Sequence, residues 1–115
     1  MKRSSLFAFL VASASAFAVW ALSPWVTGYK EPWDAPGVYY YVALLMAGTV
    51  SGLIKAKSIW AHYVGSIFGQ FLYGLLFLPL VPLAVVGFLF LVMWSLLFLV
   101  GAYLGSSIRT GAVGR

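Results

Sequence analysis

The sequence predicts an all-α integral membrane protein, in which residues 1–115 form one bundle of four transmembrane helices. Hydrophobic residues make up 63% of the 115 residues and charged residues only 8%, whereas soluble domains carry about 25% charged residues. Four apolar runs each approach the ~20 residues that a helix needs to cross the hydrocarbon core of a bilayer. The runs are residues 6–22, 38–54, 59–78 and 83–104.

The first run follows a basic start, Lys2-Arg3, and Pro24 is expected to end its helix. A basic start followed by Ala-x-Ala patterns is also typical of a secretory signal peptide. The apolar run continues past every candidate cleavage site towards spanning length, so we expect a retained helix. The sequence alone leaves cleavage within residues 1–18 open.

The loop predicted over residues 23–37 contains prolines and glycines that forbid a regular helix. It also holds both acidic residues of the chain, Glu31 and Asp34, with Trp33 between them. An ordinary solvated turn is the simpler interpretation. The functional alternative is a contact with an external cation or partner through Glu31, Trp33 and Asp34.

Short turns separate the remaining runs. The second run ends at the basic turn 55–57, and the third ends at residues 79–82, which read PLVP. Because this second turn is short, we expect the third and fourth helices to form a close antiparallel hairpin. Residues 105–115 are rich in Gly and Ser and are expected to fray.

Basic residues lie almost entirely on one side of the predicted membrane. That side carries Lys2, Arg3, Lys55, Lys57, Arg109 and Arg115. The other side carries Lys30 alone. Cations are retained on the cytoplasmic side, so we expect a plasma (inner) membrane protein with both termini cytoplasmic and the loop 23–37 outside. Despite the net charge of +5, bases scattered over helix ends argue against a nucleic-acid partner.

Three runs contain a G-x-x-x-G motif, which allows close approach of helix backbones in a membrane. The glycines are Gly48 and Gly52, Gly65 and Gly69, and Gly101 and Gly105. In the second and third helices we expect these faces to hold the bundle of one chain together. For the fourth helix, packing within the chain and homo-oligomerisation both remain open.

Polar and small side chains form one stripe along the third predicted helix. At about 100° per residue, His62, Ser66, Gln70 and Tyr73 share this face. Such a stripe faces protein or water, because lipid cannot satisfy its hydrogen bonds. It is therefore a candidate pore lining or a helix interface. We favour interhelical hydrogen bonding for Gln70 and a structural or interfacial role for His62.

The composition argues against an enzyme. The chain has no Cys and a single His, which cannot build a zinc site in one subunit. Its two carboxylates lie across the membrane from that His, so no carboxylate–His pair is expected. We therefore expect no catalytic residue, no metal and no cofactor. In size and helix number alone the chain resembles the small multidrug resistance exporters, but residues 6–22 lack that family's membrane-embedded Glu.

Two functions are consistent with these features. The stripe and the small-residue faces favour an oligomeric channel or transport-type protein of unknown substrate. The alternative is a non-catalytic accessory or assembly subunit of a larger inner-membrane complex, which the near absence of intramembrane charge supports. The expected partners are the lipid bilayer and either further copies of the chain or a larger complex. A pore requires Ser66 and Gln70 to face water, whereas a subunit requires them to be dry and packed.

Overall fold

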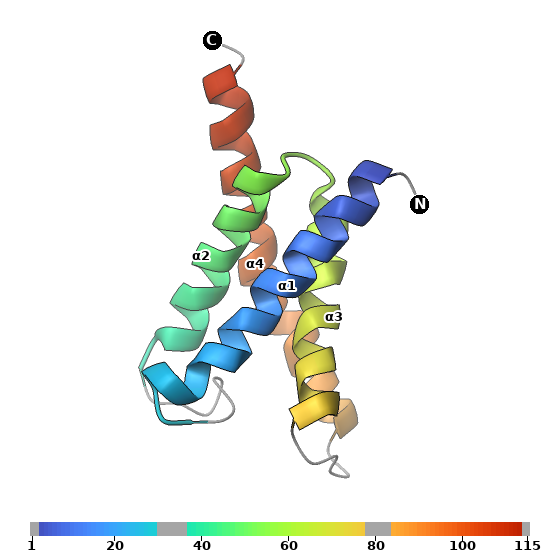
Figure 1. Cartoon of the computed structure of the whole chain (residues 1–115). Coiled ribbons are helices and arrows are strands. Elements are labelled where there is room, and N and C mark those ends of the chain that lie inside the picture. The colour runs from blue at the N-terminus through green and yellow to red at the C-terminus, as the bar shows by residue number, and fades with distance from the viewer. Residues whose placement is uncertain (1–2, 30–36, 78–83, 114–115) are drawn as a thin grey trace.

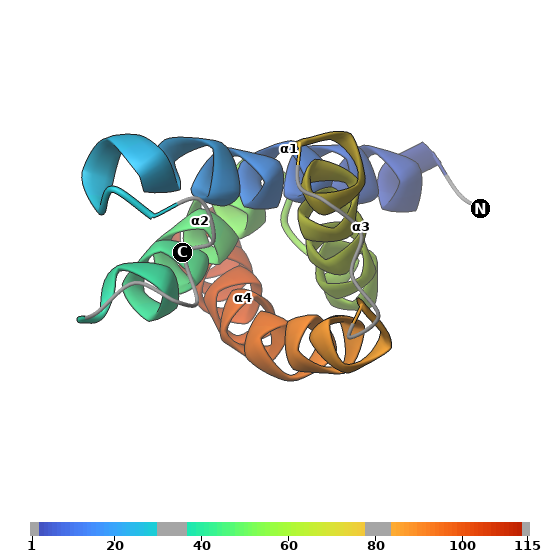
Figure 2. The same ribbon diagram turned by 90° about the horizontal axis from the view of Figure 1, so that it is seen from below.

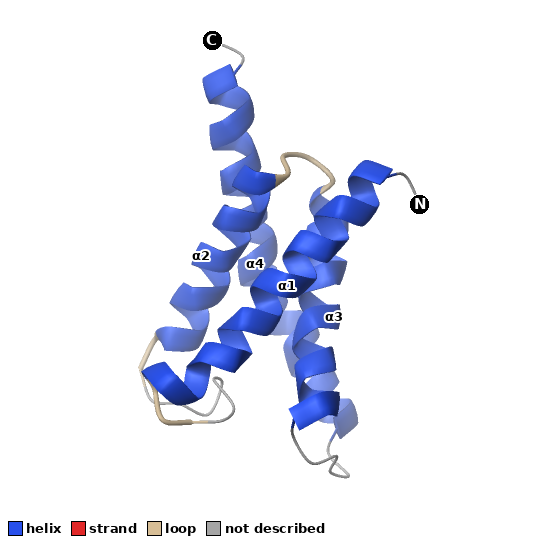
Figure 3. Cartoon of the chain, in the orientation of Figure 1, coloured by secondary structure: helices blue, strands red, loops and turns tan. Residues whose placement is uncertain are grey.

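The computed structural model describes residues 3–29, 37–77 and 84–113. The described residues contain four helices and no strand. The helices are α1 (Arg3–Val26), α2 (Tyr39–Ile54), α3 (Ile59–Phe77) and α4 (Ala84–Val113), as Figures 1 and 3 show. The predicted all-α fold with four helices is confirmed.

Two of these helices are long and apolar enough to cross a membrane. They are α1 and the segment Val86–Gly111 of α4. The other two are shorter, with 16 residues in α2 and 19 in α3. Helix length and composition thus support membrane insertion for two of the four helices.

The first helix continues past its predicted end at residue 22 and ends at Val26, so that Pro24 lies inside its last turn. A proline loses its own N–H hydrogen bond and crowds the carbonyl four residues earlier, but the bonds that follow it are still formed. The backbone N–H of Thr27 still donates to the Ser23 carbonyl at 2.8 Å, and that of Gly28 to the Pro24 carbonyl at 3.1 Å. Gly28 then ends the helix with a φ of 81°, the left-handed conformation that glycine adopts most readily.

The fourth helix also extends beyond its predicted end at residue 104. Residues 105–113 are helical rather than frayed. Gly105 and Ser106 are buried, and Ser106 Oγ accepts a hydrogen bond from the Lys57 backbone N–H at 2.8 Å. Packing against a neighbouring element therefore outweighs the low helix propensity of this Gly- and Ser-rich segment.

The helices alternate in direction, so that α1 runs parallel to α3 and α2 runs parallel to α4 (Figure 1). These two parallel pairs make the most extensive contacts in the bundle. The predicted antiparallel contact between α3 and α4 is present but smaller, and α2 and α3 barely touch. Figure 2, viewed along the bundle, shows α1 above α3 and α2 beside α4.

The α2–α4 pair is closest where glycine faces backbone. A Cβ atom added to any of four glycines would overlap a carbonyl oxygen of the opposite helix. The overlapping pairs are Gly48 with Phe98, Gly52 with Ala102, Gly101 with Leu45 and Gly105 with Thr49. Both motifs therefore meet at one crossing within the chain, including the pair on α4 whose role the sequence leaves open.

The α1–α3 pair has a similar small-residue crossing. A Cβ atom on Gly65 would overlap the carbonyl of Phe9, and one on Gly69 would overlap that of Ser13. On the α1 side the Cβ atom of the fully buried Ala12 lies 3.0 Å from the Cβ position of Gly65, and Ala8 and Ala16 are also fully buried. Close approach in this pair thus depends on glycine from α3 and alanine from α1.

The α2–α4 crossing is approximately symmetric. Position i of α2 corresponds to position i + 53 of α4, as for Gly48 and Gly101 (48 + 53 = 101). The close contacts repeat with this offset. Gly48 meets Phe98 where Gly101 meets Leu45, and Gly52 meets Ala102 where Gly105 meets Thr49. The hairpins α1–α2 and α3–α4 are thus joined mainly through the α1–α3 and α2–α4 pairs.

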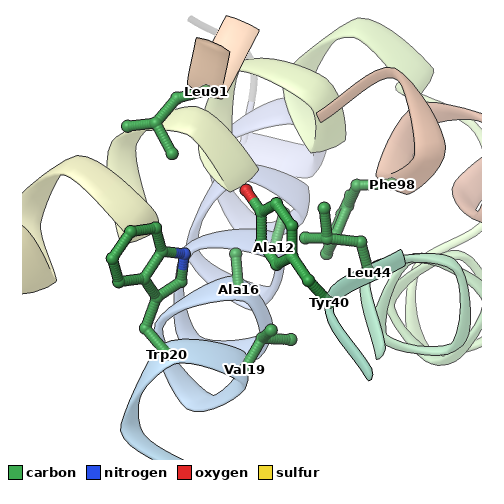
Figure 4. Packing of buried hydrophobic residues seen from close by; sticks show 8 residues of the cluster. All are labelled: Ala12, Ala16, Val19, Trp20, Tyr40, Leu44, Leu91 and Phe98. Atoms are coloured by element: carbon green, nitrogen blue, oxygen red, sulfur yellow. The ribbon is translucent and has the colours of Figure 1, made fainter. Parts of the chain in front are cut away.

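The bundle buries mainly small and polar side chains and exposes large apolar ones, which is the reverse of a soluble protein. The buried positions hold mainly small or polar residues, together with a cluster around Trp20, Tyr40, Leu44 and Phe98 (Figure 4). The exposed positions along all four helices hold large apolar side chains, such as Phe7, Val64 and Leu89. The interior is thus more polar than the outer surface.

Candidate functional site

The side chain of Gln70 lies at the centre of the bundle and hydrogen-bonds residues from all four helices. Its Oε1 accepts from Trp20 Nε1 at 2.8 Å and from Tyr40 Oη at 2.6 Å. Its Nε2 donates to Ser95 Oγ at 2.7 Å and to the Ser66 carbonyl at 3.1 Å. The indole N–H can only donate, which fixes the oxygen of the amide on its side. Both lone pairs and both N–H groups of the amide are therefore used.

Aromatic rings surround this amide. Trp20 and Tyr40 meet edge to face with ring centroids 6.2 Å apart, and Trp94 lies 6.5 Å from Tyr40. Figure 4 shows the indole nitrogen of Trp20 and the hydroxyl of Tyr40 directed into the core. Gln70 retains 1% of its surface. The rings enclose the hydrogen bonds in apolar surroundings, where such bonds are strong.

A second polar contact joins the end of α2 to the start of α3 through His62. Its Nε2 lies 2.7 Å from the carbonyl of Lys55, and its Nδ1 lies 2.7 Å from Ser51 Oγ. A carbonyl can only accept, so Nε2 carries a proton, and in the neutral ring the Ser51 hydroxyl donates to Nδ1. The imidazole is fully buried. This geometry fastens the α2–α3 turn to the bundle.

Because His62 bonds both Ser51 and the Lys55 carbonyl, we expect the variant His62→Ala to be less stable. Removing the ring leaves the buried Ser51 hydroxyl and the Lys55 carbonyl without this partner, which costs about 1–3 kcal/mol. Equilibrium unfolding of the purified protein in mixed micelles measures the change. The matched control is Ser15→Ala, because the Ser15 hydroxyl bonds only Val11 of its own helix. Equal stability of the two variants would contradict the role assigned to His62.

The stripe predicted on the third helix lies largely inside the bundle. His62, Ser66 and Gln70 are buried, whereas Tyr73 is half-buried against Phe17, at a centroid distance of 5.2 Å. The Ser66 hydroxyl donates to the carbonyl of Tyr63 at 2.7 Å. Within the described residues every buried side-chain nitrogen and oxygen has a hydrogen-bond partner.

Sequence reasoning did not identify the residues that complete this cluster. Trp20, Tyr40 and Ser95 bond Gln70, and Ser51 bonds His62. These four residues could have been noticed in the sequence, because each places a hydrogen-bonding group in an otherwise apolar helix, where that group needs a partner. The predicted external contact through Glu31, Trp33 and Asp34 lies outside the described residues.

No protein-family model, curated protein or solved structure matches this chain. The arrangement of the site is therefore the basis for any functional conclusion.

Proposed function

We propose that the protein is an integral protein of the plasma (inner) membrane that serves as a non-catalytic accessory or assembly subunit of a larger membrane complex. In this proposal all four helices span the bilayer and both termini are cytoplasmic. The protein acts through its outer surface, where it contacts lipid and its partner, and the polar interior holds the bundle in shape.

The distribution of side chains supports the membrane setting. Soluble proteins rarely expose large contiguous apolar patches, yet exposed apolar side chains cover all four helices of this bundle. Lipid removes the penalty for exposing them, and small residues at helix crossings are what helix association in lipid requires. Arg3, Lys55, Lys57 and Arg109 all belong to the end of the bundle that holds the N-terminus and the α2–α3 turn (Figure 1). The cytoplasmic orientation of this end follows from its bases.

The observation that carries the proposed role is the complete internal bonding of the Gln70 amide. A pore-lining amide exchanges hydrogen bonds with passing water or ions, whereas this one is occupied by four groups of its own chain. The polar stripe therefore has a sufficient explanation in helix association. In this proposal the outer surface of the bundle is the part of the protein that contacts the partner.

Accessibility of Ser66 tests this role directly, because the chain has no Cys of its own. We expect a cysteine introduced by Ser66→Cys to resist a membrane-impermeant thiol reagent in intact and in opened vesicles. The control is Ser107→Cys at the exposed end of α4, which should react once the cytoplasmic side is open to the reagent. Rapid labelling of the Ser66→Cys variant would contradict a dry interior and favour a water-filled pathway.

A transport-type function is the second candidate, and the position of the Gln70 cluster favours it. The cluster joins the α1–α2 hairpin to the α3–α4 hairpin, and many transporters bind substrate near the midplane between two helical halves. Transport would require the four hydrogen bonds of Gln70 to break in each cycle. The oligomeric channel expected from the sequence stays a prediction, and its pathway between copies would run along apolar outer faces.

The intact mass of the complex purified from its own membrane in mild detergent distinguishes these functions. A stoichiometric larger partner is the expected result for an accessory subunit. A species built only from copies of this chain would contradict that role. It would justify a flux assay in liposomes with Gln70→Ala as the test of transport.

A further inference from the structure

Three basic residues lie at or next to the turn between α2 and α3, and we call Lys55, Lys57 and Arg109 the basic corner. The backbone N–H of Lys57 donates to Ser106 Oγ on α4 at 2.8 Å. One turn later on α4, Arg109 Nη1 donates to the carbonyls of Leu53 and Ile54 at 3.2 and 2.7 Å. These bonds hold the three residues within about one helical turn of one another.

The backbone of the basic corner is held in an uncommon conformation. Lys57 and Ser58 have φ angles of 69° and 52°, in the left-handed region that residues other than glycine rarely adopt. Bonds from two other helices maintain it, since His62 Nε2 donates to the Lys55 carbonyl and Lys57 donates to Ser106. Strained backbone that the surroundings impose is concentrated at functional sites.

Among the described residues no acidic side chain lies beside the basic corner, because residues 3–29, 37–77 and 84–113 contain no Asp or Glu. The only two carboxylate side chains are those of Glu31 and Asp34, which precede α2 in the sequence, whereas the corner follows its last residue. The 16 residues of α2 separate the ends of that helix by roughly 24 Å at 1.5 Å per residue. The described part of the chain therefore offers the corner no counter-charge, and an external anion can supply one.

The surroundings of the basic corner indicate the chemistry of that anion. Trp60, in the first turn of α3, is 70% exposed and lies 6.0 Å from the ring of Tyr63. Exposed tryptophan is typical of the headgroup layer of a bilayer. Beyond the corner the helices expose apolar side chains such as Val50 and Val64. A ligand here meets cations first and apolar helix surface beside them, which matches an acidic phospholipid better than an acidic protein segment.

We propose that the basic corner binds the phosphate headgroup of an acidic phospholipid, with the acyl chains lying against the apolar faces beside it. Lys57, which is exposed, supplies the main charge, and Lys55 and Arg109 add to it. The proposal rests on the membrane setting proposed above. It goes beyond that setting because it assigns one headgroup class to one fixed place on the surface.

Native mass spectrometry of the full-length protein, titrated with phosphatidylglycerol or phosphatidylcholine, tests this site. Each cation near a headgroup changes affinity by about fivefold. We expect the wild type to prefer phosphatidylglycerol and the variant Lys57→Gln to bind it about fivefold more weakly. The double variant Lys55→Gln/Lys57→Gln should lose roughly 25-fold. Arg109 is left unchanged because it also caps the carbonyls of α2.

Two controls separate a site from general attraction. Lys57→Arg keeps the charge and should keep the preference, and Lys30→Gln removes the same charge from the opposite loop and should leave it unchanged. Equal weakening by Lys30→Gln, or equal binding of both lipids, would overturn the proposal. Saturable binding of inorganic phosphate alone, or displacement of the lipid by a co-purified acidic protein, would also overturn it. Detergent-dependent extraction from the membrane checks insertion separately, so failure of the lipid site and failure of the membrane setting are distinguishable.

Discussion

Gln70→Leu should destabilise the folded bundle by about 2–4 kcal/mol. Leucine has a similar volume but leaves the Trp20 N–H and the hydroxyls of Tyr40 and Ser95 without the amide that they bond. Each buried polar group left without a partner carries a desolvation penalty. The change is measured by equilibrium unfolding in mixed micelles with increasing denaturing detergent.

Partial rescue distinguishes loss of hydrogen bonds from loss of packing. Adding Tyr40→Phe and Ser95→Ala to Gln70→Leu removes two of the hydroxyls that lose their bond to the amide, and replacing both partners of a bond by apolar groups can be nearly neutral. The triple variant should therefore be more stable than Gln70→Leu alone. A change below about 0.5 kcal/mol in Gln70→Leu would mean that the amide faces water, as a pore lining requires.

The sequence identified the polar stripe but not its partners, and the reason is geometric. Helical periodicity states which side chains share a face, so His62, Ser66 and Gln70 could be grouped from one helix alone. It does not state which neighbouring helix the face meets. The loop lengths suggested α4 as the closest partner of α3, whereas the structure places α1 closest. Side-chain size decided this pairing, because the alanine face of α1 accepts the glycines of α3.

The symmetry of the α2–α4 crossing was present in the sequence as an equal spacing. Gly48 and Gly52 precede Gly101 and Gly105 by 53 positions, since 48 + 53 = 101 and 52 + 53 = 105. The same offset relates Ala12 to Gly65, although no motif marks the alanine. Motifs considered one at a time do not reveal a spacing between them. The helix ends were less predictable, because the helical conformation at Pro24 and over residues 105–113 depends on contacts with other elements.

Polar residues make the two hairpins different. At the 53-residue offset, Gln70 corresponds to Phe17 and His62 corresponds to Phe9. The Gln70 cluster requires Trp20 and Tyr40 from the first hairpin and Ser95 from the second. We therefore attribute the pairing of unlike hairpins to these hydrogen bonds, a specificity role known for some buried polar groups.

Gly48→Ala and Gly101→Ala should each destabilise the bundle by about 1–3 kcal/mol, the cost of overpacking. In each case the new methyl group would overlap a backbone carbonyl, of Phe98 or of Leu45, which cannot move as a flexible side chain can. The matched control is Gly74→Ala, because nothing lies within 4 Å of a Cβ at that helical position. The control should gain about 0.5–1 kcal/mol from the better helix propensity of alanine. Unfolding in mixed micelles measures all three variants.

The symmetry of the α2–α4 crossing makes this prediction stricter, because Gly48 and Gly101 occupy equivalent places in it. Their individual costs should agree, and the double variant should cost less than their sum, since separating α2 from α4 once relieves both overlaps. Gly48→Ala combined with Gly69→Ala should instead be additive, because Gly69 lies at the separate α1–α3 crossing. Additive costs for Gly48 and Gly101 would mean that each glycine adjusts alone and that the hairpins do not share one crossing.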